Sequence, residues 1–228
     1  MMGALCLIVG GVMFVLYPLV RPWADESTAD GAALAMSSGA WVASHAFAMI
    51  GFILVALGLL ALAAAVRGTR AERIAWVAVV TSWIGAGLTL PYYGAEDFGL
   101  HAIGSQATAG KPIDVLSLVE DVRYQPVAMT MFGIGLIALA VSGVLTAIAV
   151  ARSGRLSRYA GWLFAIGYIL FLPQFFGPPA VRIGHGVLLG IGLVWLAIAL
   201  WRATKSVGRR QPVAAGPITV EDRAVPRS

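Results

Sequence analysis

The sequence predicts an all-α membrane protein built as a bundle of six transmembrane helices. Hydrophobic residues make up 59% of the 228 residues and charged residues only 12%, whereas a typical soluble chain carries about a quarter charged residues. Uncharged apolar stretches recur along the chain at lengths that are typical of membrane spans. The strands of a barrel would need short segments of alternating polarity, which the sequence lacks. A soluble globular domain is therefore excluded.

Six stretches have the length needed to cross a hydrocarbon core about 30 Å thick. We predict spans at Gly3 to Val20, Gly39 to Val66, Ile74 to Tyr93, Gln125 to Ala151, Tyr159 to Phe176 and Ile183 to Trp201. Together they form one transmembrane domain over residues 1–202. The polar segment 203–228 has no apolar periodicity, so we predict a disordered cytoplasmic tail there.

The distribution of basic residues predicts the orientation, because Lys and Arg near span ends are retained on the cytoplasmic side. The loops 67–73 and 152–158 and the segment after Trp201 carry 12 of the 16 basic residues, while the opposite side carries eight of the 11 acidic residues. We therefore expect a multi-pass protein of the cytoplasmic (inner) membrane with both termini inside. The net charge of +5 follows from this topology, so nucleic acid is not an expected partner.

The first predicted span is interpreted as a retained helix, because no Lys or Arg precedes its apolar run as in a signal peptide. The single cysteine, Cys6, lies within it, so no intrachain disulfide can form. The following segment, 21–38, is acidic and rich in Ala and Ser without clear periodicity. We interpret it as a solvated loop.

The second and third spans resemble the fourth and fifth, which predicts a tandem helical-hairpin repeat. Three arginines in the loop 67–73 match three in the loop 152–158 at an offset of 85 residues. The outer ends of the third and fifth spans also share a Leu-Pro pair followed by aromatic residues and Gly. Because both hairpins run in the same direction, the two copies would be related by an axis along the membrane normal.

Proline and glycine positions predict how the spans pack. Pro91 and Pro173 lie near the outer ends of their spans, where a missing backbone donor kinks or ends a helix and splays the outer half of the bundle. Gly186 and Gly190 have the GxxxG spacing that lets a neighbouring helix approach closely. We therefore expect a tightly packed bundle with an outward-facing cavity.

The longest connection, 94–124, carries a second kind of helix. Its segment 112–123 places four aliphatic side chains at helical spacing, opposite acidic and polar ones. This pattern predicts an amphipathic helix on the outer surface. Pro112 suits its first position and Asp114 its positive end.

The candidate functional residues are the ionisable side chains of the outer half, because charge at membrane depth is costly and is a functional candidate by default. All three histidines fall on this side. We predict that catalytic residues are Glu96, Asp97 and His101, and that ligand-binding residues are His45, Arg123, Arg182 and His185. No tight metal-ligand spacing such as HExxH is present, so no metal site is predicted and the cofactor stays unknown.

Three functions remain open. The favoured one is an accessory, structural or ligand-sensing component, in which the outer charges pair with one another, for example Arg182 with Glu96 or Asp97. Such a protein would assemble with a membrane protein partner or a second copy through Gly-rich helix faces. A charge-coupled transporter is disfavoured because no span centre contains an acidic or basic residue.

The two alternatives use the same outer residues differently. In a membrane-embedded enzyme of the isomerase or cyclase type, Glu96 or Asp97 would act as general acid or base on a lipid or isoprenoid held by arginine. In a single-haem or metal-binding protein, His45 and His185 would be the ligands from two facing helices. The lipid bilayer is an expected partner in every case.

Overall fold

The prediction of an all-α fold is confirmed by a computed structural model, which describes residues 1–208 and contains no β-strand within them. The long helices are α1 (Met2–Val20), α3 (Gly39–Ala65), α4 (Glu72–Gly94), α7 (Pro126–Arg152) and α9 (Pro179–Gly208). The shorter elements are α2 (Ala29–Met36), the π-helix η1 (Ala95–Gly99), α5 (Leu100–Thr108), α6 (Val115–Arg123), α8 (Trp162–Ile169) and the 3-10 helix η2 (Pro173–Phe176).

Among the described residues, five helical segments are long and apolar enough to cross a membrane. They are α1, α3, the continuous run Glu72–Thr108, α7 and α9 as far as Lys205. The sixth predicted span, at 159–176, differs from the others because its only α-helix, α8, is eight residues long. Pro173 opens η2 just beyond it, and the 3-10 turn and the Gly177-Pro178 pair replace regular helix there.

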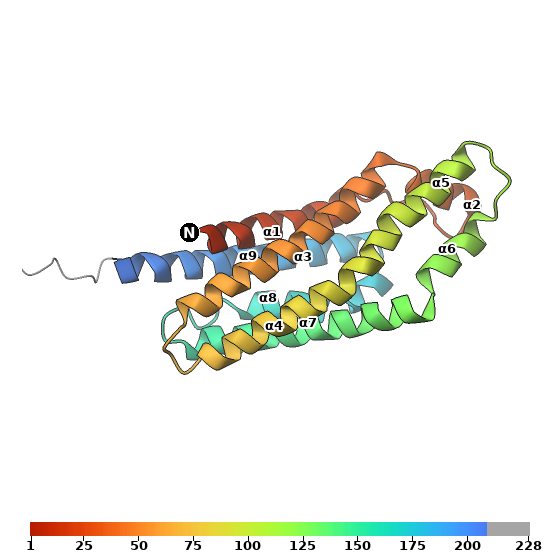
Figure 1. The fold of residues 1–228 in the computed structure, drawn as a ribbon. Coiled ribbons are helices and arrows are strands. Elements are labelled where there is room, and N and C mark those ends of the chain that lie inside the picture. The colour runs from red at the N-terminus through yellow and green to blue at the C-terminus, as the bar shows by residue number, and fades with distance from the viewer. Residues whose placement is uncertain (209–228) are drawn as a thin grey trace, which may run out of the picture.

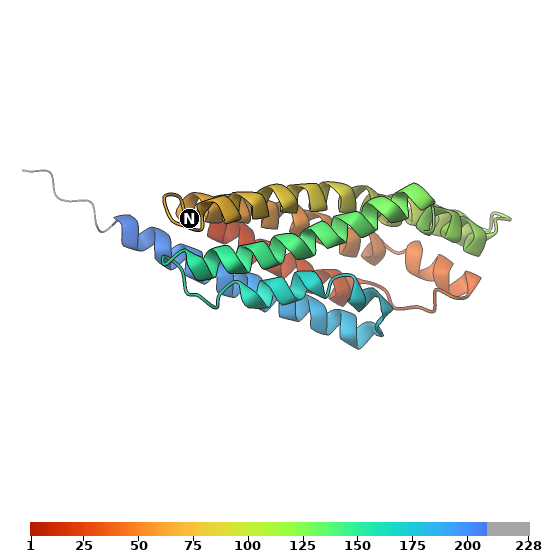
Figure 2. The same ribbon diagram turned by 90° about the horizontal axis from the view of Figure 1, so that it is seen from below.

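The long helices and the segment that contains α8 follow one another around a bundle (Figures 1 and 2). Each packs on its neighbour in chain order, and α1 closes the ring against α9. A side chain on Gly3 would meet Ala61 of α3 and Leu200 of α9, so the N-terminus and the end of α9 lie at the same end of the bundle. Arg155 reaches the carbonyl of Ala65 at this end, which places the loop 153–161 there too.

We call this the basic end, because the chain there carries eight basic residues and only one acidic residue within the described part. The opposite end, which we call the capped end, is covered by α2, α5 and α6 (Figure 1). The segment that contains α8 runs from the basic end to the capped end, although α8 itself is short.

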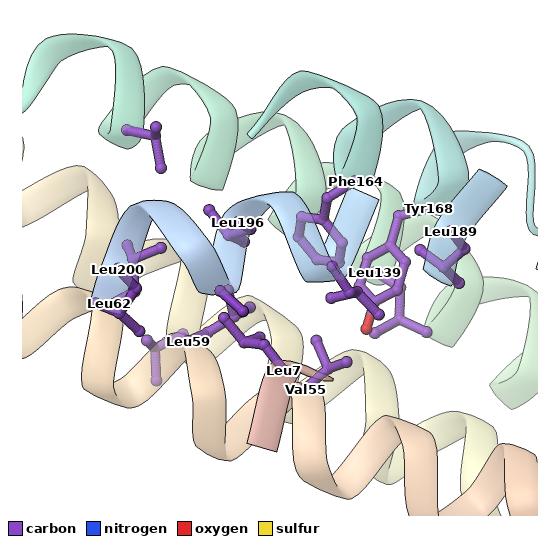
Figure 3. Packing of buried hydrophobic residues seen from close by; sticks show 14 of the residues in the cluster. Leu7, Val55, Leu59, Leu62, Leu139, Phe164, Tyr168, Leu189, Leu196 and Leu200 are labelled. Carbon is purple, nitrogen blue, oxygen red and sulfur yellow. The ribbon is translucent and has the colours of Figure 1, made fainter. Parts of the chain in front are cut away.

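Buried aliphatic and aromatic side chains from α1, α3, α7, α8 and α9 fill the interior, as Figure 3 shows for Leu7, Leu59, Leu139 and Phe164. In a bilayer this burial gains little hydrophobic energy, because lipid tails are as apolar as leucine. Close packing carries the stability instead. Accordingly, a Cβ on Gly85 of α4 would lie only 2.9 Å from the carbonyl oxygen of Gly135 on α7.

Two boundaries differ from the sequence expectation. Pro91 does not end its span, because the helix passes through it and continues as η1 and α5. A π-helical turn adds one residue per turn and is a common way to accommodate a local irregularity. Helix α6 begins at Val115 and not at Pro112, since Asp114 is the N-cap and accepts from the amide of Ser117 at 3.1 Å.

The interpretation of 21–38 as a solvated loop was wrong. Thr28 caps α2 within it, and Met36 is fully buried in a second hydrophobic cluster with Trp41, Leu100 and Val119. At the other terminus, α9 continues as a helix to Gly208, into the expected tail. The remainder of that tail, 209–228, lies outside the described residues.

The hairpin repeat and the membrane-surface role of the amphipathic helix stay predictions. The first hairpin pairs two long helices, α3 and α4, whereas the second pairs α7 with the short α8. One local feature is common to both. Gly68 and Gly154, each in an arginine-rich loop, adopt positive φ values of 75° and 63°, which glycine allows without strain.

Candidate functional site

A cavity of about 500 Å³ lies at the capped end of the bundle. One wall is polar and the other is aromatic and aliphatic, as is common for sites that bind organic ligands. The charged and imidazole groups in its wall are Arg21, Glu26, His45, Glu96, Arg123 and Arg182.

The polar wall is a chain of alternating charges. The Nη2 of Arg21 lies 2.7 Å from Oε1 of Glu26, and Oε2 of Glu26 lies 2.7 Å from Nη2 of Arg123. The Nε and Nη2 of Arg123 in turn donate to the two oxygens of Glu96, at 2.7 and 3.1 Å. This bidentate geometry is the strong form of an arginine–carboxylate pair. The chain of ion pairs ties the end of α1, η1 and α6 together across the cavity.

Contacts other than the ion pairs also hold these side chains in position. Arg21 is the C-cap residue of α1, and its guanidinium lies 4.4 Å from the ring centroid of Trp41, a cation–π distance. The indole of Trp41 donates to the carbonyl of Glu96 at 2.8 Å, which anchors η1 against α3. Arg123 is the last residue of α6, where a cation interacts favourably with the helix dipole.

The neighbouring charges keep both Glu26 and Arg123 ionised. Burial by itself would raise the pKa of the Glu26 carboxyl, but the guanidinium groups of Arg21 and Arg123 outweigh it and hold this pKa below its ordinary value. Burial would likewise lower the pKa of Arg123, and the carboxylates of Glu96 and Glu26 raise it instead. Both groups therefore stay charged at neutral pH.

His45 ends the chain of polar contacts and is buried, with 2% exposure. Its Nε2 lies 3.0 Å from Nη1 of Arg21, which can only donate, so Nε2 is the acceptor. Its Nδ1 then carries the hydrogen and donates to the carbonyl of Trp41 at 2.8 Å. His45 is thus held as a neutral imidazole that positions Arg21.

Arg182 lies on α9 and differs from the other two arginines of the cavity. Its guanidinium faces the rings of Trp23 and Phe175, at 5.0 and 5.3 Å. It also donates to Oε1 of Gln174 at 3.3 Å and to the hydroxyl of Tyr17 at 3.4 Å. The ion pairs found within residues 1–208 involve Arg21 and Arg123 but not Arg182, so the cavity has one positive charge in excess.

The apolar wall comes from α7 and the segment around η2. Phe132 is buried there, whereas Met129, Leu172 and Phe176 are 41%, 40% and 87% exposed. Gly133 also lines the cavity, and a Cβ built on it would find no atom within 4 Å. Met129 and Gly133 lie one and two turns into α7, so this side of the cavity lies along the flank of the bundle rather than at its end.

Four of the seven predicted site residues, His45, Glu96, Arg123 and Arg182, meet in this cavity. The expected pairing of Arg182 with Glu96 or Asp97 is replaced by the pairing of Arg123 with Glu96. The sequence could not distinguish these partners, because the choice depends on where α6 folds back.

The other three predicted residues lie outside the cavity wall. Asp97 is fully buried in η1, and within the described part of the chain neither carboxylate oxygen has a hydrogen-bond partner. His101 on α5 contacts the carbonyl of Met36 at 2.7 Å, next to the second hydrophobic cluster. His185 lies 2.8 Å from the carbonyl of Gly167. The geometry does not bring Asp97 and His101 to a common reaction centre with Glu96.

Sequence reasoning missed Arg21, Glu26, Tyr17, Tyr92 and Tyr93, all of which line the cavity. Arg21 and Glu26 fell in a segment interpreted as solvated, although an arginine directly after a span is a signal that could have marked the first of them. The tyrosines belong to apolar runs. Nothing in their spacing distinguishes a cavity wall from an ordinary core position.

The histidines do not fit a haem held between α3 and α9. A haem ligand needs a free imidazole lone pair, usually that of Nε2. In His45 that lone pair accepts from Arg21, and Nε2 of His185 is engaged with the carbonyl of Gly167. Within residues 1–208, no group of three or more His, Cys, Asp or Glu side chains is placed to hold a metal ion.

Comparisons of the chain with protein-family models, with curated proteins and with solved structures found no match. Its function must therefore be argued from the site.

Proposed function

We propose that the protein is a multi-pass component of the cytoplasmic membrane whose outward-facing cavity binds an anionic amphiphile, that is, an apolar chain with a carboxylate or phosphate group. In this topology the chain crosses six times, the basic end is cytoplasmic and the capped end is external. The eight basic residues of the basic end support the orientation through the positive-inside rule. The N-terminus and the described end of α9 lie at one end of the bundle, which supports an even number of crossings up to that point.

Cysteine labelling tests this topology. In a Cys6→Ala background, a membrane-impermeant maleimide should label Ser117→Cys in intact cells, because Ser117 is exposed on α6. The same reagent should label Lys205→Cys only after the membrane is permeabilised. Labelling of Lys205→Cys in intact cells would contradict the sixth crossing.

The ligand class follows from Arg182, the observation that carries the proposal. Among residues 1–208 its guanidinium has no carboxylate partner, and it lies next to an aromatic and aliphatic wall, which supports binding of an anion that is attached to an apolar chain. The hydroxyl of Tyr17, which accepts from Arg182 at 3.4 Å and lines the cavity, adds a polar atom at the same point. A small hydrophilic anion would leave the apolar wall uncovered.

The route to the cavity is lateral in this proposal. In the proposed orientation, the exposed side chains of Met129, Leu172 and Phe176 and the open space over Gly133 would lie at the depth of the outer leaflet. An amphiphile could therefore pass from the leaflet between α7 and η2 without leaving the membrane. This makes a ligand-sensing role, with a lipid as the ligand, the best supported of the expected functions.

Binding of oleate to the detergent-purified protein tests the ligand class. We expect saturable binding that weakens roughly tenfold or more in Arg182→Gln, because a hydrogen bond to a charged group contributes about 1.5–3 kcal/mol. Binding of oleyl alcohol, which has the same chain without the charge, should be similar in both proteins. Arg158→Gln at the basic end is the matched control, and it should bind oleate like the wild type.

The same assay tests the lateral route. Gly133→Leu should weaken oleate binding by filling the opening, whereas Gly87→Leu on the exposed face of α4, where a Cβ also meets no atom, should not. Equal oleate affinity in the wild type and Arg182→Gln would contradict the proposed ligand. Assembly with a partner protein or a second copy stays a prediction.

A further inference from the structure

A second cavity, of about 390 Å³, lies at the basic end of the bundle, far from the first. One face of α9 and the loop 153–161 form it. Its lining includes Arg155, Ser157, Trp195, Ile198 and Arg202.

The polar rim of this second cavity is cationic. Arg155 and Arg202 are both exposed, and the ion pairs within the described residues all lie at the capped end. Arg155 uses its Nη1 to donate to the carbonyl of Ala65 at 2.9 Å, which holds the side chain in place and leaves its other nitrogens available. Ser157 supplies an exposed hydroxyl beside it. Two guanidinium groups and a hydroxyl suit a phosphate oxyanion.

The floor of the second cavity is apolar and extends toward the middle of the bilayer. Trp195, Ile198 and Arg202 share one face of α9, because they are three or four residues apart. Trp195 and Ile198 are 41% and 37% exposed, and they lie one to two turns deeper than Arg202. An acyl chain attached to a phosphate at Arg202 would run over these two side chains.

We propose that this cavity binds an anionic phospholipid of the leaflet at the basic end, with its phosphate between Arg155 and Arg202 and its acyl chain against Trp195 and Ile198. Basic pockets between transmembrane helices commonly bind lipid headgroups in this way. The apolar floor favours a lipid over free phosphate, which would contact only the rim. This site is independent of the proposed function, because it shares no residue with the outer cavity.

Native mass spectrometry with added phosphatidylglycerol or phosphatidylcholine tests the proposal. The wild type should retain phosphatidylglycerol in preference to phosphatidylcholine, and the double variant Arg155→Gln/Arg202→Gln should lose about tenfold to thirtyfold in affinity for phosphatidylglycerol. The matched control is Arg67→Gln/Arg70→Gln, which removes the same charge from the same end but outside the cavity. It should retain phosphatidylglycerol.

Three outcomes would overturn the proposal. Equal loss in the control would mean that the overall positive field attracts the lipid, and equal retention of the two phospholipids would mean that no headgroup is recognised. If inorganic phosphate alone raises the melting temperature of the wild type as much as phosphatidylglycerol does, the ligand is free phosphate. Should the double variant fail to fold, Arg202→Gln alone leaves the contact between Arg155 and Ala65 intact and is compared in the same way.

Discussion

Replacing Arg123 with leucine is expected to lower the thermal stability of the purified protein strongly. Arg123 is the only residue that bridges Glu26 and Glu96 among the ion pairs of the described chain, and its loss leaves Glu96 without a cation while Glu26 keeps only Arg21. The side chains of Glu26 and Glu96 are only 20% and 12% exposed, so water compensates them poorly. Breaking a buried pair costs about 3–5 kcal/mol, and partial exposure here reduces this to about 2–4 kcal/mol.

Thermal unfolding in one detergent, followed by circular dichroism, measures the effect. Arg67→Leu removes an exposed arginine at the basic end and should change the melting temperature little. In the double variant Glu96→Gln/Arg123→Leu the unpaired carboxylate is gone and Arg21 keeps its pair with Glu26, so much of the lost stability should return. A double variant no more stable than Arg123→Leu would show that Arg123 acts through packing rather than charge.

Arg123 and Glu96 also illustrate what the sequence can say about the site. Both were predicted because they are ionisable residues on the outer side of a highly apolar chain. Their roles were not predicted, since Glu96 was assigned to catalysis and Arg123 to ligand binding. In the structure the two side chains form an ion pair with each other. Pairing across 27 residues, or across 97 residues for Glu26 and Arg123, leaves no periodic signal in the sequence.

The fold was more predictable than the site for a physical reason. Membrane helices must satisfy their backbone hydrogen bonds internally, so an apolar run of sufficient length has few alternatives to a helix. This logic located α1, α3, α7 and α9 to within a few residues at most ends. It failed around α8, where the chain is equally apolar but contains backbone conformations that hydropathy does not detect. It also missed α2, whose short helix depends on burial against Trp41 and its neighbours.

Replacing Gly186 with leucine is expected to separate α9 from α1. The GxxxG spacing of Gly186 and Gly190 predicted a close helix contact, and α1 packs there. A Cβ on Gly186 would lie 2.6 Å from the carbonyl oxygen of Phe14 and 2.8 Å from Cγ of Pro18. Backbone and a proline ring cannot move aside as a flexible side chain can. Overpacking typically costs 1–3 kcal/mol, and a clash with backbone places this variant at about 3 kcal/mol or more.

Gly184→Leu is the matched control, because it lies on the same helix and a Cβ there meets no atom within 4 Å. Its melting temperature should equal or exceed that of the wild type, since leucine favours helix more than glycine does. The comparison also tests the site, because α1 carries Tyr17 and α9 carries Arg182. If the close contact of α1 with α9 holds the cavity in shape, Gly186→Leu should weaken oleate binding while Gly184→Leu does not. Equal melting temperatures for the two variants would show that α1 and α9 tolerate separation, and that this contact does not position Arg182.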